Sequence, residues 1–230
     1  MQEKIMKRSW SLQALRDHII YNRGKDQSLL DLVASIDRGI VIFRYHFATA
    51  RDSLADFFGS SEAAKQEQVK RVLGASDDQD EYQLAKIANE ANTIAAIYTV
   101  RSLYDLLAQL IRGLLLDGAL TESACNIHRV RDHLPEGDLK TAIEEVLDSE
   151  GFQYINAFAN VSKHRALVKF GSWVDFVNDK SGVKFSAFEY RGQLFSELWS
   201  DEILDKILKT KNEIITAGIA LNQELLAEQA

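Results

Sequence analysis

The stretch that decides the fold is residues 29–58, which read LLDLVASIDRGIVIFRYHFATARDSLADFF. Its apolar residues follow one another at alternating spacings of four and three, which places them on one face of a long α helix. Gly39 weakens such a helix, so packing must compensate for it. The pattern leaves open whether the stripe packs inside the chain or against a second copy. The residues of the stripe are Leu29, Val33, Ile36, Ile40, Phe43, Phe47, Ala50, Leu54 and Phe57.

A second long helix is predicted at about 80–116, and it carries two apolar stripes. This arrangement predicts that the buried face of the helix changes near its middle. Arg101 and Asp105 lie where the first stripe would continue, so they either face solvent or line a polar pocket. The first stripe comprises Leu84, Ile87, Ala91, Ile94 and Tyr98, and the second, from Val100 onward, comprises Leu103, Leu107, Leu110 and Leu114.

The remainder of the chain predicts shorter elements. Short helices are expected at 61–73, after Thr121, at 138–149 and at 152–166. The pattern then alternates and is rich in Val and Phe, which predicts a β-hairpin at about 169–190 with strands 169–177 and 183–190 and a turn at 178–182. A last helix is expected at about 200–228. The prediction is a single all-α domain over residues 1–230, a bundle of about seven helices with a β-hairpin inserted before the C-terminal helix.

Composition limits the function. The 27 basic and 34 acidic residues give a net charge of −7, which disfavours bulk attraction to nucleic acid but leaves room for a local basic patch. One cysteine, Cys125, excludes an intramolecular disulfide and a cysteine-based zinc cluster. Neither a signal peptide nor an uninterrupted apolar run of about 18 residues is evident. We therefore expect a cytoplasmic protein without a membrane segment. Glycine-rich phosphate loops and metal-binding motifs are absent from the sequence, so neither a cofactor nor a metal is expected.

Residues 160–165 read NVSKHR and close the helix expected at 152–166. Asn160 and His164 are four residues apart, so their side chains are neighbours on a helix. The amide can fix the tautomer of the imidazole, which can act as an acid or a base at cellular pH. Lys163 and Arg165 can hold phosphate charge. Such a set suits metal-independent RNA cleavage, in which the ribose 2′-OH attacks its own phosphate.

The same basic residues also have a purely structural interpretation. Cations near the C-terminal end of a helix interact favourably with the helix dipole, by about 0.3–1 kcal/mol each. Both interpretations are physically sound, and on the residues alone a solvated helix end is favoured over a phosphate site.

Two stretches together resemble the HEPN superfamily. They are EANTIAAIYTVRSLYDLLAQLIRGLL at 90–115 and FQYINAFANVSKHRALV at 152–168, and the similarity is greatest to a bacterial branch with an Asn-x-x-Lys-His-Arg element. The resemblance covers about residues 85–168. It implies a compact α-helical bundle, often a homodimer. Many HEPN domains are metal-independent ribonucleases of toxin–antitoxin or phage-defence systems, with an antitoxin or other protein partner, and others bind RNA or nucleotides without catalysis.

The sequence departs from the catalytic members at one point. Catalytic HEPN ribonucleases carry an arginine shortly before the histidine, whereas Phe158, Ala159 and Asn160 occupy those positions and Arg165 follows instead. The usual catalytic pair is therefore not carried over to this chain, and the resemblance transfers only to the branch motif itself.

Two functions remain to be tested. In the first, the protein binds RNA or a nucleotide and is a candidate ribonuclease. His164 and Asn160 would then be catalytic, Lys163 and Arg165 would bind phosphate, and Arg101 and Asp105 would line the cleft. In the second, the protein is a non-catalytic dimeric interaction or scaffold protein. The apolar stripe and the hairpin would then form the dimer surface, and the basic residues would only end a helix.

Overall fold

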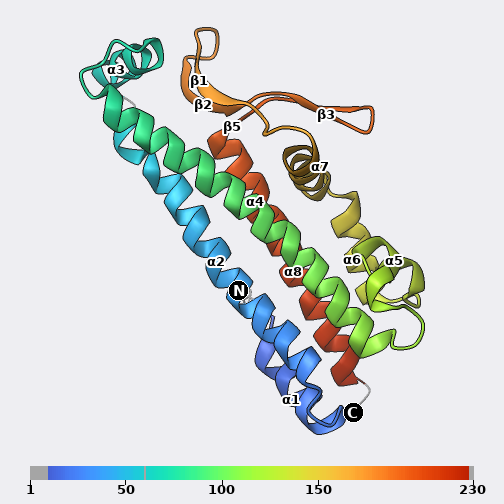
Figure 1. Cartoon of the computed structure of the whole chain (residues 1–230). Coiled ribbons are helices and arrows are strands. Elements are labelled where there is room, and N and C mark those ends of the chain that lie inside the picture. Colours follow the sequence, from blue (N-terminus) through green and yellow to red (C-terminus); the bar gives the residue numbers. More distant parts are fainter. Residues whose placement is uncertain (1–9, 60, 228–230) are drawn as a thin grey trace, which may run out of the picture. The chain divides into compact units, whose positions relative to one another are not determined.

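The computed structural model describes residues 10–59 and 61–227 (Figure 1). A mostly helical chain with a small antiparallel sheet before the C-terminal helix was predicted, and this is confirmed. Helix α1 was not foreseen, and position 228 of the last predicted helix lies outside the described residues. The helices are α1 (Leu12–Asn22), α2 (Gln27–Ser53), α3 (Glu62–Leu73), α4 (Gln79–Leu115), α5 (Ile127–His133), α6 (Asp138–Asp148), α7 (Glu150–His164) and α8 (Ser200–Ala227). The strands are β1 (Phe170–Asp175), β2 (Lys180–Phe185), β3 (Phe188–Tyr190), β4 (Gln193–Phe195) and β5 (Leu198–Trp199), and the 3₁₀ turns are η1 (Ala55–Phe57) and η2 (Glu122–Ala124).

The chain forms two compact units. Unit 1 contains the residues up to Ile40, Ser102–Phe152 and the residues from Lys209 onward. Unit 2 contains Val41–Arg101 and Gln153–Leu208. Helices α2, α4, α7 and α8 each contribute residues to both units.

The apolar stripe of α2 forms part of the core of the chain. Leu29, Val33 and Ile36 are buried in unit 1, and Phe43 and Ala50 are buried in unit 2. The stripe is therefore an intramolecular core. It is not the dimer seam that the sequence had left open.

The buried face of α4 differs from the prediction. Leu84 and Ile87 are exposed, at 70% and 57%, and Ala91 is exposed as well. One continuous face is buried instead, because the stripe that begins at Val100 extends toward the start of the helix through two buried polar residues, Asn89 and Thr93. An apolar pattern does not include polar residues, so the predicted change of the buried face is wrong. The buried face comprises Tyr82, Asn89, Thr93, Ala96, Ile97, Val100, Leu103, Tyr104, Leu107, Ala108, Leu110, Ile111 and Leu114.

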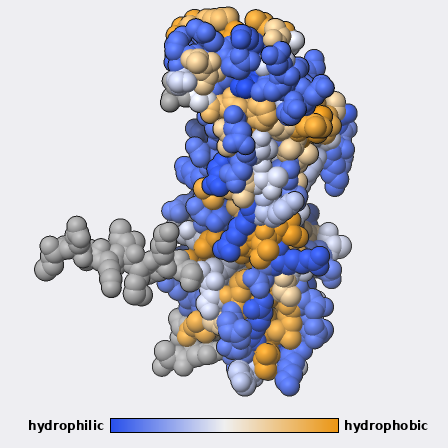
Figure 2. All heavy atoms as spheres, turned by 90° about the vertical axis from the view of Figure 1, so that its left-hand side faces the viewer, coloured by the Kyte–Doolittle hydropathy of each residue, from blue (hydrophilic) through white to orange (hydrophobic). Residues whose placement is uncertain are grey.

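Large apolar side chains also remain on the surface. Figure 2 shows apolar patches that alternate with hydrophilic regions on one face. Single exposed apolar residues are ordinary, whereas adjacent ones are informative. The exposed set comprises Tyr21, Val41, Ile42, Tyr45, Leu73, Leu84, Ile87, Leu167, Trp173, Phe176, Val177, Leu194 and Leu226.

Two helix glycines allow α2 and α4 to approach closely in unit 1. A Cβ atom on Gly39 would lie 2.8 Å from Cδ2 of Leu103, and one on Gly113 would lie 2.5 Å from Cδ2 of Leu29. Leucine side chains of the opposite helix fill the space that the missing side chains leave. This packing offsets the low helix propensity of Gly39.

A third glycine joins the two ends of unit 1. A Cβ atom on Gly218 of α8 would collide with the indole ring of Trp10. The same indole donates a hydrogen bond from Nε1 to Oδ1 of Asn222, at 3.2 Å, and Asn222 donates to the carbonyl of Ser11 at 2.8 Å. Because these bonds fix the ring, it cannot move aside for a larger residue at position 218.

Replacing Gly218 by alanine is expected to lower the free energy of unfolding by about 1–3 kcal/mol, because the new methyl group overlaps the indole. In a Trp10→Ala background the same change should instead stabilise by up to about 1 kcal/mol, since alanine favours helix over glycine. Guanidinium unfolding of the wild type, both single variants and the double variant measures this difference. An equal cost in both backgrounds would contradict the packing described.

The β structure lies in unit 2 and differs in register from the predicted hairpin. β1 pairs antiparallel with β2, and β5 adds two residues to the other edge of β2. The turn occupies 176–179, because the carboxylate of Asp175 accepts hydrogen bonds from the backbone N–H groups of Val177 and Asn178. Gly182 therefore lies inside β2, not in the turn, and residues 188–195 form a second hairpin, β3–β4.

The second hairpin covers α7 with aromatic rings. Tyr154 of α7 contacts Phe188 and Phe195, with ring centroids 5.4 and 6.0 Å apart. Phe158 contacts Phe185 and Phe188 at 5.4 and 5.8 Å. Burial raises the pKa of the Tyr154 phenol, whose hydroxyl has no hydrogen-bond partner among the described residues. These contacts anchor the helix that carries the predicted site.

Helix α4 is the one described helix that is long and apolar enough to cross a membrane by length and composition. Half of the stretch that meets this test is buried inside the chain. Core helices of water-soluble proteins meet the same test, so this is weak evidence for a membrane segment.

Candidate functional site

The predicted site lies at the C-terminal end of α7, in unit 2. The helix ends at His164, two residues earlier than expected, and the backbone N–H groups of Arg165 and Ala166 both donate to the carbonyl of Val161, at 2.9 and 3.2 Å. Lys163 and His164 thus occupy the last helical turn, where the positive charge of Lys163 suits the helix dipole. Arg165 is the first residue after the helix.

Asn160 turns toward the preceding turn of its own helix. Its Nδ2 donates to the backbone carbonyl of Asn156 at 2.7 Å and to Oδ1 of Asn156 at 3.3 Å. Nε of Arg101, on α4, donates to the same Oδ1 at 3.0 Å. The structure therefore brings Asn160 and Arg101 together through Asn156, which was not among the predicted site residues. The periodicity of α7 places Asn156 on the same flank, and that was the available signal.

The basic side chains themselves point into solvent. Lys163, His164 and Arg165 are all exposed. Nη1 of Arg165 donates to the backbone carbonyl of Glu189 at 3.2 Å. Among the described residues, neither Lys163 nor His164 has a hydrogen-bonded side chain or an ion pair. The structure thus leaves these groups accessible, and it does not place the Asn160 amide on the imidazole.

Several lysines elsewhere in unit 2 are engaged by carboxylates. Lys180 lies 3.1 Å from a carboxylate oxygen of Asp201, Lys184 lies 2.8 Å from Glu197, and Lys65 contacts Asp179. The end of α7 differs from these places because no described carboxylate lies within ion-pair distance of its basic groups. The remaining predicted residue, Asp105, is exposed and belongs to unit 1.

This arrangement determines which chemistry the site can perform. Two exposed cations that are two residues apart, Lys163 and Arg165, can neutralise the phosphates of a ligand that binds at the surface. General acid–base catalysis requires in addition a group that orients the imidazole and a second group that exchanges a proton. No described side chain is hydrogen-bonded to His164. The described residues also include no group of three His, Cys, Asp or Glu side chains that could hold a metal ion.

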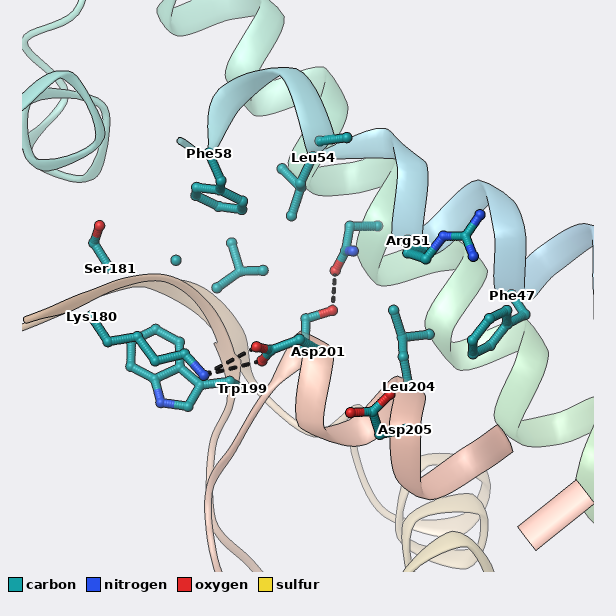
Figure 3. A pocket seen from close by; sticks show the side chains of 15 residues that line it. Phe47, Arg51, Leu54, Phe58, Lys180, Ser181, Trp199, Asp201, Leu204 and Asp205 are labelled. Atoms are coloured by element: carbon teal, nitrogen blue, oxygen red, sulfur yellow. Dashed lines mark hydrogen bonds and ion pairs between the residues drawn. The ribbon is translucent and has the colours of Figure 1, made fainter. Parts of the chain in front are cut away.

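A second candidate site was missed by the sequence analysis. It is a cavity in unit 2 between the end of α2, β2 and the start of α8 (Figure 3). Its lining comes from four segments that are far apart in the sequence, so no motif or periodicity could have revealed it. Gly182 in β2 and the Trp199-Ser200-Asp201 run were the only local signals.

The exposed and buried sides of α7 lead to opposite predictions for stability. His164→Ala should change the free energy of unfolding by less than about 0.5 kcal/mol, because its side chain is exposed and has no partner. Phe158→Ala should cost about 3–5 kcal/mol, since its ring is fully buried against the β-hairpins. Urea unfolding followed by circular dichroism separates the two. A large loss in the histidine variant would mean that the imidazole supports the fold.

Comparison of the chain with protein-family models, with characterised proteins and with solved structures finds no match. The resemblance to HEPN domains therefore depends on the two quoted stretches alone, and any function has to be argued from the geometry of the chain itself.

Proposed function

We propose that the protein is a HEPN-like RNA-binding protein that contacts phosphates with the end of α7 and does not cleave them with His164. The observation that carries this proposal is the exposed run of Lys163, His164 and Arg165, for which no described carboxylate provides an ion pair. Cations that are already accessible can bind phosphate without first breaking an ion pair.

Binding is favoured over cleavage by the side chains around the imidazole. The Asn160 amide, which would have to orient His164, is engaged by Asn156 at 2.7 Å. A solvated imidazole without a second proton-transfer group lacks the arrangement that acid–base catalysis needs. Cleavage by a residue at this position is the main alternative outcome of the test below.

A polymer is favoured over a free nucleotide because Lys163 and Arg165 are exposed and neither lines the cavity of unit 2. A mononucleotide is usually held in a concave site that buries its base. Two exposed cations suit consecutive phosphates along a strand, where affinity depends on released counterions.

The test uses a fluorescein-labelled single-stranded RNA of mixed sequence in EDTA, with binding followed by anisotropy over a series of salt concentrations. The Lys163→Ala/Arg165→Ala variant should bind more weakly, and its slope of log K against log salt should be shallower by about 0.7 for each lost phosphate contact to the single strand. Asn160→Ala should bind like the wild type, because its side chain does not face the ligand.

Arg129→Ala/Lys209→Ala is the matched control, since it removes the same charge from exposed positions of unit 1. Equal loss in the control would mean that only net charge matters. The same RNA, end-labelled and resolved on a gel, reports cleavage. Cleavage by the wild type and not by His164→Ala would replace the binding proposal with a ribonuclease. Competition by ATP as strong as that by RNA would favour a nucleotide ligand.

A second candidate function is a non-catalytic protein that associates with a second copy of itself through the β1–β2 hairpin. Phe176 and Val177 at the turn are 82% and 92% exposed, and Trp173 is 45% exposed. β1 is an edge strand of the sheet, so its outward N–H and C=O groups are open to pairing with another strand. Adjacent apolar side chains beside a strand edge are typical of association surfaces.

For this candidate, light scattering after gel filtration should give a dimer for the wild type and a monomer for Phe176→Ser/Val177→Ser. Leu194→Ser is the control, because it removes another exposed apolar side chain, at the β3–β4 hairpin. A wild-type monomer, or a dimer that survives the double substitution, would contradict association through this hairpin.

A further inference from the structure

The cavity in unit 2 is independent of the basic end of α7. It has a volume of about 440 Å³, which lies within the usual range for small-molecule sites. Its lining side chains converge from α2 and η1, from α4, from β2 and from the first turns of α8 (Figure 3). Neither Lys163 nor Arg165, which we propose to contact RNA, lines this cavity.

The walls of the cavity are apolar and partly aromatic. Phe47, Leu54 and Phe58 line one side in Figure 3, and Trp199 and Leu204 line others. Burial of apolar ligand surface against such walls stabilises a complex by roughly 25 cal/mol per Å² before the costs of association. The body of a ligand should therefore be apolar.

Gly182 keeps this space open. A Cβ atom at position 182 would lie 3.4 Å from Cζ3 of Trp199 and 3.8 Å from Cζ of Phe58. A longer side chain at this position would extend between the two rings and fill the cavity. The backbone of Gly182 lies in β2 with a regular pairing to Trp173, so the glycine is not required by the strand itself.

The buried polar groups of the lining already have partners. Asn89 Nδ2 donates to the carbonyl of Ala50 at 2.7 Å, and Ser200 Oγ donates to Oδ1 of Asn89 at 2.7 Å. These bonds hold the lining rigid and leave little hydrogen-bonding capacity for a ligand. Charge at the mouth of the cavity must therefore determine the polar end of the ligand.

The two cations at the mouth are each held by carboxylates. Lys180 is paired with Asp201 at 3.1 Å, and Glu202 lies 3.8 Å from it. Nε of Arg51 donates to Asp52 at 2.8 Å, and the guanidinium points away from the cavity in Figure 3.

Asp205 is the remaining charged group of the lining. It lies one helical turn after Asp201, is exposed, and has no ion pair among the described residues. Around the mouth and the Trp199 wall, the carboxylates of Asp52, Glu197, Asp201, Glu202 and Asp205 outnumber the cations of Arg51, Lys180 and Lys184, the last of which lies 4.2 Å from the centre of the Trp199 ring. The electrostatic potential there favours a positive group.

We infer that this cavity binds a small amphipathic amine: an apolar, planar body between Phe47, Phe58 and Trp199, with its ammonium group at Asp205. An anionic ligand would meet the unpaired carboxylate, and a strongly polar body would be desolvated against apolar walls without gaining hydrogen bonds.

Equilibrium dialysis of the full chain at pH 7 tests this with three probes that share one ring system: 1-naphthylmethylamine, 1-naphthylmethanol and 1-naphthylacetate. The amine should bind about two- to fivefold more tightly than the alcohol, as expected for an exposed ion pair, and the acetate should bind most weakly. Asp205→Asn should remove the preference for the amine and leave the alcohol unchanged. Asp117→Asn, which neutralises an exposed carboxylate of unit 1, should change none of the three.

Gly182→Leu should weaken all three probes at least about tenfold, because it fills the cavity. If circular dichroism shows that this variant is unfolded, Ala55→Trp takes its place, since Ala55 is an exposed residue at the mouth whose enlargement blocks entry. Unchanged binding in a folded blocking variant, a preference for the acetate, or no binding of the amine at about 1 mM would overturn the inference. Because no probe carries phosphate and RNA binding is measured separately, either proposal can fail alone.

Discussion

One buried amide connects the elements of unit 2. Asn89 of α4 donates to the carbonyl of Ala50 on α2 and accepts from Ser200 at the start of α8. The side chain is only 2% exposed, so an unmade bond would cost about 1–3 kcal/mol. This requirement fixes the register of three helices against one another, and with it the positions of β5, which precedes Ser200, and of the cavity beside it.

The long helices could be predicted because their cores follow the 3.6-residue period. Most of the stripe from Leu29 to Leu54 is buried as expected, with Ile40 and Phe47 half-buried, and the face of α4 beyond Val100 is buried as well. The first half of α4 was misread because Asn89 and Thr93 occupy core positions and a polar residue carries no weight in an apolar pattern. The hairpin register was missed because Gly182 was assigned to the turn. The turn is instead determined by the side chain of Asp175, and a glycine in the sequence does not reveal whether it serves the backbone or an adjacent cavity.

The candidate sites show the same division between local and distant information. Sequence spacing placed Asn160, Lys163 and His164 on one end of one helix, because helical neighbours are fixed by local geometry. It did not show that Asn156 is the partner of Asn160, since an amide can bond either forward to an imidazole or backward to its own helix. The cavity could not be predicted from the sequence, because tertiary packing alone brings together Phe47, Asn89, Gly182 and Asp205.

The contact of Trp10 with Gly218 and Asn222 has a consequence for how the chain folds. Unit 1 is assembled from three separate segments, and its Trp10 contacts join residues more than 200 positions apart. Contacts of such high sequence separation are slow to form, because a long loop must close before they stabilise anything. During synthesis the indole of Trp10 therefore cannot form its native contacts until α8 has been made. A chain released before Asn222 would leave this apolar ring without its hydrogen-bond partner. Burial of Trp10 therefore requires that α8 has been synthesised.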